Sequence, residues 1–284
     1  MHRICTDDVV ASVFLAYIMR NLVITTALLA VLMCCGCLHN LGRPSQVERD
    51  KAFALGGQEA ISLEPTLAGT TYYVFRFTKQ LPKEFLLMDW AAREFADSVR
   101  GREFAMGMAT SVYSSGYLIT AAHCTRNYIY IGGEFSGRRR LVPAVLVCKK
   151  WERTGAEYAI LKVDEFLPKV LKFGPTPSIE AGIYCLLQSN EVSWDRKLAA
   201  GKVLSIEKAN DGSHLDTITT DIPTWHGDSG SGVVDKLGRF VGIVTAGEWQ
   251  LRGFHPKTEK FICLIDEDEV LALVSNYEAS NKSR

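Results

Sequence analysis

The sequence predicts an all-β domain of the sandwich or barrel-pair type. Short apolar segments recur along the chain at regular spacing, and glycine, proline or other turn residues bound each of them. Two segments with helical periodicity interrupt this series. Hydrophobic residues make up 47% of the chain, so a substantial core can form and a disordered chain is excluded.

The expected strands fall into two sets. The first set comprises residues 72–78, 109–113, 117–120, 128–131, 141–148 and 158–163. The second set comprises residues 182–188, 202–207, 217–221, 232–234, 240–246 and 261–265. Segments this short, separated by Gly and Pro turns, favour barrels or sandwiches over a doubly wound α/β sheet.

The two helical segments lie near residue 90 and near the C-terminus. Apolar side chains recur at helical spacing over 83–99, which predicts an amphipathic helix inserted between strands. A second helix is expected after the acidic run 266–269, because carboxylates are favourable at a helix N-terminus.

The N-terminus has the composition of an export signal. Arg20 precedes an uninterrupted apolar or small run over 22–33, and a Cys-Cys-Gly-Cys sequence follows at 34–37. A basic start, a short apolar core and small residues at its end are typical of a secretory signal peptide, and the run is too short to span a bilayer. Met1 and Met19 both remain open as the true start.

Gly36-Cys37 resembles the end of a bacterial lipobox, in which the cysteine is lipidated and becomes the mature N-terminus. Cys34 stands where that box usually carries leucine. The resemblance implies lipidation at Cys37 and an exported protein of the cell envelope, either lipid-anchored in a membrane or periplasmic. The alternative is a plain membrane anchor through the apolar stretches 9–18 and 22–33.

These features divide the chain into four parts. Residues 1–37 form the signal peptide and anchor segment, 38–69 a tether, 70–278 the folded domain and 279–284 a tail. The segment 38–69 is polar and punctuated by Gly and Pro, which suits a tether, although 47–55 could form a short helix.

The net charge and the cysteine spacing argue against two functions, nucleic-acid binding and zinc binding. The chain has 32 basic and 32 acidic residues, so it lacks the basic excess of a nucleic-acid binder. The folded domain contains Cys124, Cys148, Cys185 and Cys263, whose spacing matches no zinc pattern. Four cysteines allow three pairings or none, so their pairing stays open. We expect no metal, no cofactor and no nucleic acid.

The strongest chemical signal is the run 226–232, which reads His-Gly-Asp-Ser-Gly-Ser-Gly. A serine hydroxyl such as that of Ser229 becomes nucleophilic when a base removes its proton and nearby donors stabilise the resulting oxyanion. The glycines permit a tight turn that can aim the amides of Gly227 and Ser229 at one point. Taken alone, the run also suits a simple Gly/Ser turn between strands.

A histidine motif precedes this run. The apolar strand 116–120 leads through two alanines to His123, whose imidazole can take a proton near neutral pH. The runs 120–124 (Thr-Ala-Ala-His-Cys) and 227–230 (Gly-Asp-Ser-Gly) resemble the histidine and serine motifs of the trypsin-like serine peptidases. The resemblance covers roughly residue 72 to the C-terminal helix. It implies two six-stranded β-barrels with the site in the cleft between them.

The same resemblance implies an acid between the two motifs. Residues 157–163 read Glu-Tyr-Ala-Ile-Leu-Lys-Val and fit the family's acid motif, with Glu where the family has Asp. Glutamate holds the imidazole in some hydrolase triads, so we predict a triad of His123, Glu157 and Ser229. Asp164 and Glu152 remain alternatives for the acid. The order His, acid, Ser and the missing Gly-x-Ser-x-Gly motif argue against an α/β-hydrolase.

The chain departs from the digestive-type relatives. No Arg or Lys followed by Ile-Val-Gly-Gly precedes His123, and in activated zymogens that new amino terminus pairs with the acid before the serine. Asp228 must therefore have a different partner, as expected of the bacterial, non-zymogen type. Cys124 also lacks the usual upstream cysteine of the histidine loop.

The resemblance also places a primary substrate pocket. The matching positions are Thr224, Thr245 and Gly247, and no acid lies among them. A strong preference for Arg or Lys is therefore not expected.

The resulting prediction is an exported, membrane-tethered serine endopeptidase with a polypeptide substrate and a lipid membrane as partners; its oligomeric state stays open. The alternative is a catalytically silent trypsin-like domain that serves as an envelope binding or scaffold module, which the glutamate at 157 motivates. An HtrA-like quality-control peptidase is less favoured, because only residues 251–284 follow residue 250.

Overall fold

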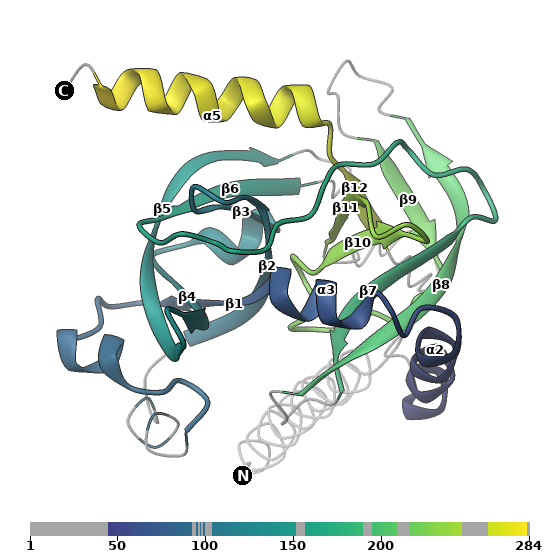
Figure 1. Ribbon diagram of the computed structural model, residues 1–284, viewed down its shortest axis with the longest axis horizontal. Coiled ribbons are helices and arrows are strands. Elements are labelled where there is room, and N and C mark those ends of the chain that lie inside the picture. The colour runs from purple at the N-terminus through teal and green to yellow at the C-terminus, as the bar shows by residue number, and fades with distance from the viewer. Residues whose placement is uncertain are drawn as a thin grey trace, which may run out of the picture. The chain divides into compact units, whose positions relative to one another are not determined.

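The computed structural model confirms the all-β prediction as a pair of closed antiparallel barrels (Figure 1). It describes residues 45–92, 95, 97, 99, 104–151, 157–189, 195–208, 216–245 and 261–282. The predicted signal peptide, the lipidation site Cys37 and the pocket residue Gly247 lie outside these residues. None of the helices within the described ranges is long and apolar enough to cross a membrane.

The first barrel is formed by the N-terminal half of the described chain. Its strands, in their order around the barrel, are β1 (Thr71–Phe77), β2 (Phe104–Tyr113), β3 (Tyr117–Thr120), β6 (Glu157–Val163), β5 (Arg138–Trp151) and β4 (Tyr128–Phe135). Alternate side chains of a strand face opposite sides of the barrel, and on one side the large residues Tyr73, Phe75 and Met108 form a buried cluster with Trp90 of the segment that follows β1.

The second barrel has the same number of strands and the same antiparallel pairing. Its order is β7 (Gly182–Gln188), β8 (Arg196–Glu207), β9 (Thr217–Thr220), β12 (Phe261–Leu264), β11 (Phe240–Val244) and β10 (Gly232–Asp235). Smaller aliphatic residues fill it, among them Ile183, Val233 and Ile262. All twelve predicted strands therefore exist, and β2 and β8 begin earlier than the pattern indicated.

The segment predicted as a tether is helical where the structure describes it. Helices α2 (Gln46–Glu59) and α3 (Glu64–Thr70) replace an extended linker, and α2 begins with a capping box formed by Ser45 and Glu48. Ala52 and Phe53 of α2 join the core of the second barrel. This apolar contact holds the helix on the domain, beside β8 in Figure 1.

The insertion over 83–99 is not one continuous helix. A short 3-10 helix, η1 (Lys83–Leu87), is followed by turn and bend residues at 90–92, and Phe95 is again helical. Between them the Asp89 carboxylate accepts a hydrogen bond from the amide of Ala91 at 2.9 Å, which stabilises a turn. The turn places Trp90 against Tyr73 in the first barrel.

The C-terminal helix α5 (Glu267–Lys282) confirms the prediction and joins the two barrels. It follows β12 of the second barrel yet lies along β5 and β6 of the first (Figure 1). Asp266 caps it by accepting from the amide of Glu269 at 2.9 Å. Glu269 in turn accepts hydrogen bonds from Lys150 and from the hydroxyl of Tyr158.

Several further contacts join the two barrels near the histidine and serine motifs. One apolar cluster contains residues of both, including Leu118 and Ile160 of the first and Leu186 and Phe240 of the second. The amide of Met108 in β2 donates to the carbonyl oxygen of Ser229 at 2.7 Å. The serine run therefore packs directly against the first barrel.

Candidate active site

His123 lies where β3 ends in a single turn of 3-10 helix, η2 (Ala122–Thr125). The Thr125 hydroxyl donates to the carbonyl oxygen of Ala122 at 2.7 Å and stabilises this turn. From β1, the Arg76 guanidinium donates to the carbonyl oxygen of His123 at 2.7 Å. The backbone of His123 is thus fixed from two sides, while its side chain remains 27% exposed.

Glu157 is the first residue of β6, and its side chain is directed at His123. The imidazole Nδ1 and the carboxylate Oε1 are hydrogen-bonded, and the Glu157 side chain is only 5% exposed. A carboxylate can only accept, so Nδ1 carries a proton, and in the neutral imidazole Nε2 then keeps its lone pair. Asp164 lies exposed beyond the other end of β6, and Glu152 lies outside the described residues. Of the described candidate acids, Glu157 is the one that contacts His123.

The electrostatic environment favours the protonated imidazole. Burial lowers the pKa of His123, but the side chains of Cys124 and Glu157 outweigh this effect, so the pKa lies above its ordinary value. The second carboxylate oxygen of Glu157, Oε2, is buried and has no hydrogen-bond partner among the described residues. The charge of Glu157 therefore acts chiefly on His123.

Ser229 is buried in a tight loop that precedes β10. The amide of Gly230 donates to the carbonyl oxygen of Val244 at 2.7 Å, and the amide of Ser231 donates to that of Asp228 at 3.0 Å. Among the described residues, neither Gly227 nor Ser229 uses its amide in a backbone hydrogen bond. Both donors of the predicted oxyanion hole therefore remain available. The Ser229 hydroxyl and the His123 ring are not hydrogen-bonded to each other in this structure.

The loop depends on glycine at position 230. Gly230 has φ +89°, and a β-carbon there would overlap the carbonyl oxygen of Met108. We expect Gly230→Ala to lower the free energy of unfolding by about 3 kcal/mol, since backbone strain and overpacking add. Gly137→Ala is the matched control, because Gly137 has φ +75° with open space around it. Equal losses for both variants in chemical denaturation would contradict this account of the loop.

Asp228 is fully buried and makes several polar contacts. Its Oδ1 accepts from the amide of Gln188 at 2.9 Å, and its Oδ2 accepts from the amide of Trp225 at 2.7 Å. Oδ2 also accepts from the Arg49 guanidinium of α2 at 3.1 Å. Arg49 is the partner that the sequence required for Asp228 but did not identify, because no local pattern marks a residue 179 positions away.

Two residues of the predicted substrate pocket are described, and they flank in sequence the loop that contains Ser229 (the serine loop, residues 226–232): Thr224 precedes it and Thr245 follows it. Thr224 is half-buried and Thr245 is buried. His226, next to the loop, is exposed, as expected for a turn residue.

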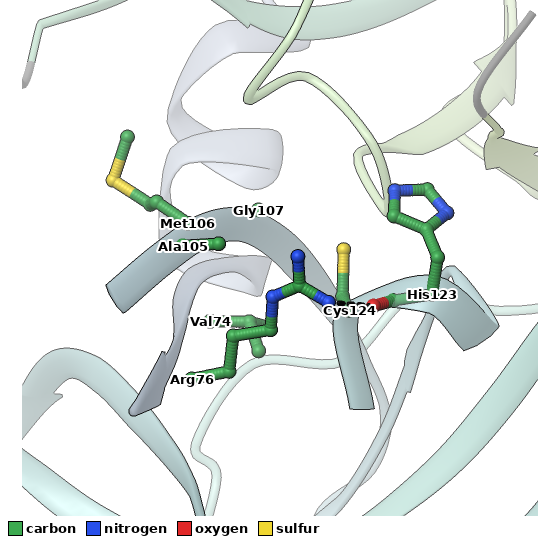
Figure 2. A pocket seen from close by; sticks show the side chains of 7 residues that line it. All are labelled: Val74, Arg76, Ala105, Met106, Gly107, His123 and Cys124. Atoms are coloured by element: carbon green, nitrogen blue, oxygen red, sulfur yellow. Dashed lines mark hydrogen bonds between the residues drawn. The ribbon is translucent and has the colours of Figure 1, made fainter. Parts of the chain in front are cut away.

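A small cavity of about 30 Å³ adjoins His123 on the first barrel (Figure 2). Its lining comprises Val74, Arg76, Ala105, Met106, Gly107, His123 and Cys124, of which the sequence had indicated only His123 as a site residue. In Figure 2 the Arg76 guanidinium points toward Cys124 and the backbone of His123. In the part of the chain that the structure describes, no disulfide joins Cys124, Cys148, Cys185 or Cys263.

Comparisons with known proteins agree with this geometry. Residues 107–243 match the trypsin-like peptidase domain family, a range that contains His123, Glu157 and Ser229. No curated protein matches the chain in sequence.

Solved structures with the same fold include HtrA-type proteins. The HtrA-type protease AlgW, solved with a tripeptide, is 19% identical with a TM-score of 0.51, and the match covers 82% of this chain and 63% of that one. The serine endoprotease from Yersinia pestis is 18% identical with a TM-score of 0.50, covering 76% and 65%. Deg5 is 13% identical with a TM-score of 0.50, covering 76% and 91%.

These structures are similar in fold, and the chain spans less than two thirds of the length of AlgW and of the Yersinia pestis endoprotease. The family match covers the stretch from β2 to β11, and the two barrels have the arrangement that the sequence motifs implied. Residues 107–243 are therefore similar to a trypsin-like peptidase domain, and they lie in the two-barrel fold that the sequence motifs implied.

Proposed function

We propose that this protein is an exported serine endopeptidase that hydrolyses polypeptides through a Ser229-His123-Glu157 triad. The observation that carries the proposal is the hydrogen bond between the imidazole of His123 and the buried carboxylate of Glu157. It supports the tautomer in which Nε2 is a proton acceptor, as a general base requires. The Ser229 loop, held on β2 by the amide of Met108, belongs to the same inter-barrel region.

The proposed reaction has two halves. The Ser229 oxygen attacks the peptide carbonyl carbon as its proton passes to Nε2 of His123, and the amides of Gly227 and Ser229 stabilise the oxyanion. The C–N bond then breaks as His123 returns the proton to the leaving amine. Water repeats the sequence on the acyl-enzyme, which releases the acid and restores the serine. Glu157 stabilises the imidazolium in both halves.

A polypeptide substrate is supported by the family match and by the tripeptide of the AlgW structure. The proposed primary pocket comprises Thr224, Thr245 and Gly247, which suits an uncharged side chain because none of them is acidic. The cavity beside His123 adjoins the proposed base, and Arg76 is the charged residue in its lining.

Active-site labelling tests this proposal. A fluorophosphonate probe should label the wild-type chain, and Ser229→Ala should abolish labelling while leaving the circular dichroism spectrum unchanged. If the wild-type protein reacts with the probe, its cleavage of a peptide library then defines which substrate side chain the proposed primary pocket prefers. Labelling that survives Ser229→Ala would exclude Ser229 as the nucleophile. A folded wild type that is never labelled would favour the silent scaffold module instead.

Export and lipid anchoring are part of the proposal and rest on residues 20–37. We expect the protein, produced in a bacterium, to fractionate with membranes and to incorporate a fatty-acid label. Cys37→Ser should remove the label and shift the protein out of the membrane fraction, while Cys35→Ser, a neighbouring cysteine, should not. Membrane association without any label in the wild type would count against lipidation and for the plain anchor.

A further inference from the structure

Arg49 is a buried cation on α2 that reaches the serine loop from outside both barrels. Its side chain is 8% exposed. One terminal nitrogen donates to Asp228 Oδ2 and to the carbonyl oxygen of Pro223, each at 3.1 Å, and the other donates to the carbonyl oxygen of Gln188. A planar guanidinium suits this task because it presents several donors in a fixed geometry.

These contacts converge on the segment that shapes the oxyanion hole. Asp228 stands between Gly227 and Ser229, whose amides are the two proposed donors. Its carboxylate is tied to the end of β7 through the amide of Gln188 and to the start of the loop through the amide of Trp225. With the carboxylate held at these points, the peptide groups on both sides of Asp228 have little freedom to rotate.

The arrangement needs the positive charge. Burial raises the pKa of Asp228, while the Arg49 guanidinium and the amides of Gln188 and Trp225 oppose that shift. A buried carboxylate without its cation is strongly unfavourable. Without Arg49, the Asp228 carboxylate would take up a proton or turn toward solvent, and either change alters the loop that carries the two donors.

Helix α2 is fixed tightly enough to deliver Arg49 to this point. The capping box of Ser45 and Glu48 starts the helix one turn before Arg49. At Gly56 the helix lies so close to β8 that a β-carbon would overlap the carbonyl oxygen of Leu198. Phe53, between them, is buried in the second barrel.

We infer that Arg49 is a positioning residue of the peptidase: from helix α2 it holds Asp228, and through Asp228 the amides of Gly227 and Ser229, in the geometry that stabilises the oxyanion. The inference rests on the proposed function. It makes the helix over 46–59 a required part of the active site, although it lies upstream of both barrels and of the family match.

The test compares Arg49→Gln with Arg49→Lys, using Lys51→Gln as the matched control because Lys51 is exposed on the same helix. All are made in the full chain and assayed by the rate constant of fluorophosphonate labelling. Arg49→Gln should slow labelling by about 100-fold, the usual effect of losing one oxyanion donor. Arg49→Lys should recover part of the rate, because an ammonium retains the charge but not the three bonds. Lys51→Gln should match the wild type.

Hydrogen exchange supplies a readout that does not depend on activity. In a Ser229→Ala background, amides in a peptide covering residues 222–231 should exchange at least 10-fold faster with Arg49→Gln, while peptides from the first barrel stay unchanged. A purely structural ion pair would instead raise exchange throughout the second barrel.

The outcomes separate this inference from the proposed function. A wild type without labelling overturns the proposed function, and unchanged exchange over 222–231 overturns the placement of the loop by Arg49. A labelled wild type whose Arg49→Gln variant reacts at the same rate overturns the inference alone. If Arg49→Gln does not fold, Arg49→Lys decides: wild-type labelling and exchange overturn the inference, and slowed labelling with local loosening supports it.

Discussion

Replacing His123 with alanine is expected to lower kcat for peptide cleavage by about 10⁶-fold, the largest effect of any single change outside Ser229. The imidazole is the only described titratable ring in contact with Glu157, so no neighbouring group can take the proton from Ser229 in its place. The measurement is the turnover of a substrate chosen from the peptide library, with circular dichroism to show that the variant folds.

The matched control for that experiment is His226→Gln, which alters an exposed histidine close to the loop. It should change kcat by less than about 10-fold, because an exposed side chain in a turn adds little to the stabilisation of the transition state. A loss as large as that of His123→Ala would show that His226 is also required and would contradict the assignment of the base to His123 alone.

Glu157→Gln is expected to lower kcat by about 10⁴-fold, because an amide can favour the wrong tautomer of His123 and cannot stabilise its cation. The carboxylate also helps to raise the pKa of His123. Since the neutral imidazole is the base, activity rises as pH increases through that pKa. Removing the carboxylate lowers the pKa, so the acid limb of the pH profile should move to lower pH as the maximum falls. The measurement is kcat/KM from pH 5 to pH 10.

Glu157→Asp distinguishes the two functional hypotheses. If the Glu triad is active, the shorter side chain draws the carboxylate back from Nδ1 and activity should fall. If the wild type is a silent scaffold, the family's usual aspartate should create activity where there was none.

The pH profile of Glu157→Gln is a separate test. If the acid limb of kcat/KM does not move in that variant, Glu157 does not act on His123.

Much of the fold follows from local pattern. The strands at 117–120 and 182–188 have the bounds that alternation and turn residues predict. β8 begins at Arg196 rather than at 202, because its small residues, Ala199 to Gly201, have little β propensity and form a strand only by pairing with β7. The helix predicted over 83–99 is interrupted for a related reason: the spacing of apolar residues cannot reveal the turn that Asp89 stabilises.

The candidate site, like the fold, was predicted partly from sequence motifs and partly only from the structure. His123, Glu157 and Ser229 each occupy a strand end or a tight turn whose neighbours in sequence create the required backbone, so short motifs are enough to find them. The alternatives for the acid were separated only by the structure, which turns Glu157 toward His123 and leaves Asp164 exposed at the opposite end of β6.

By itself, the sequence determined that the chain has two sets of short strands, that the candidate nucleophile and base have the order found in the trypsin-like peptidases, and that Asp228 lacks the amino-terminal partner of that family's activated zymogens. Only the tertiary structure decided what replaces that partner. Arg49 meets Asp228 because α2 packs on β8, and a contact across 179 positions depends on the packing of a whole helix rather than on any neighbouring residue. A segment whose composition suggested a tether therefore supplies a buried charge to the loop that carries Ser229.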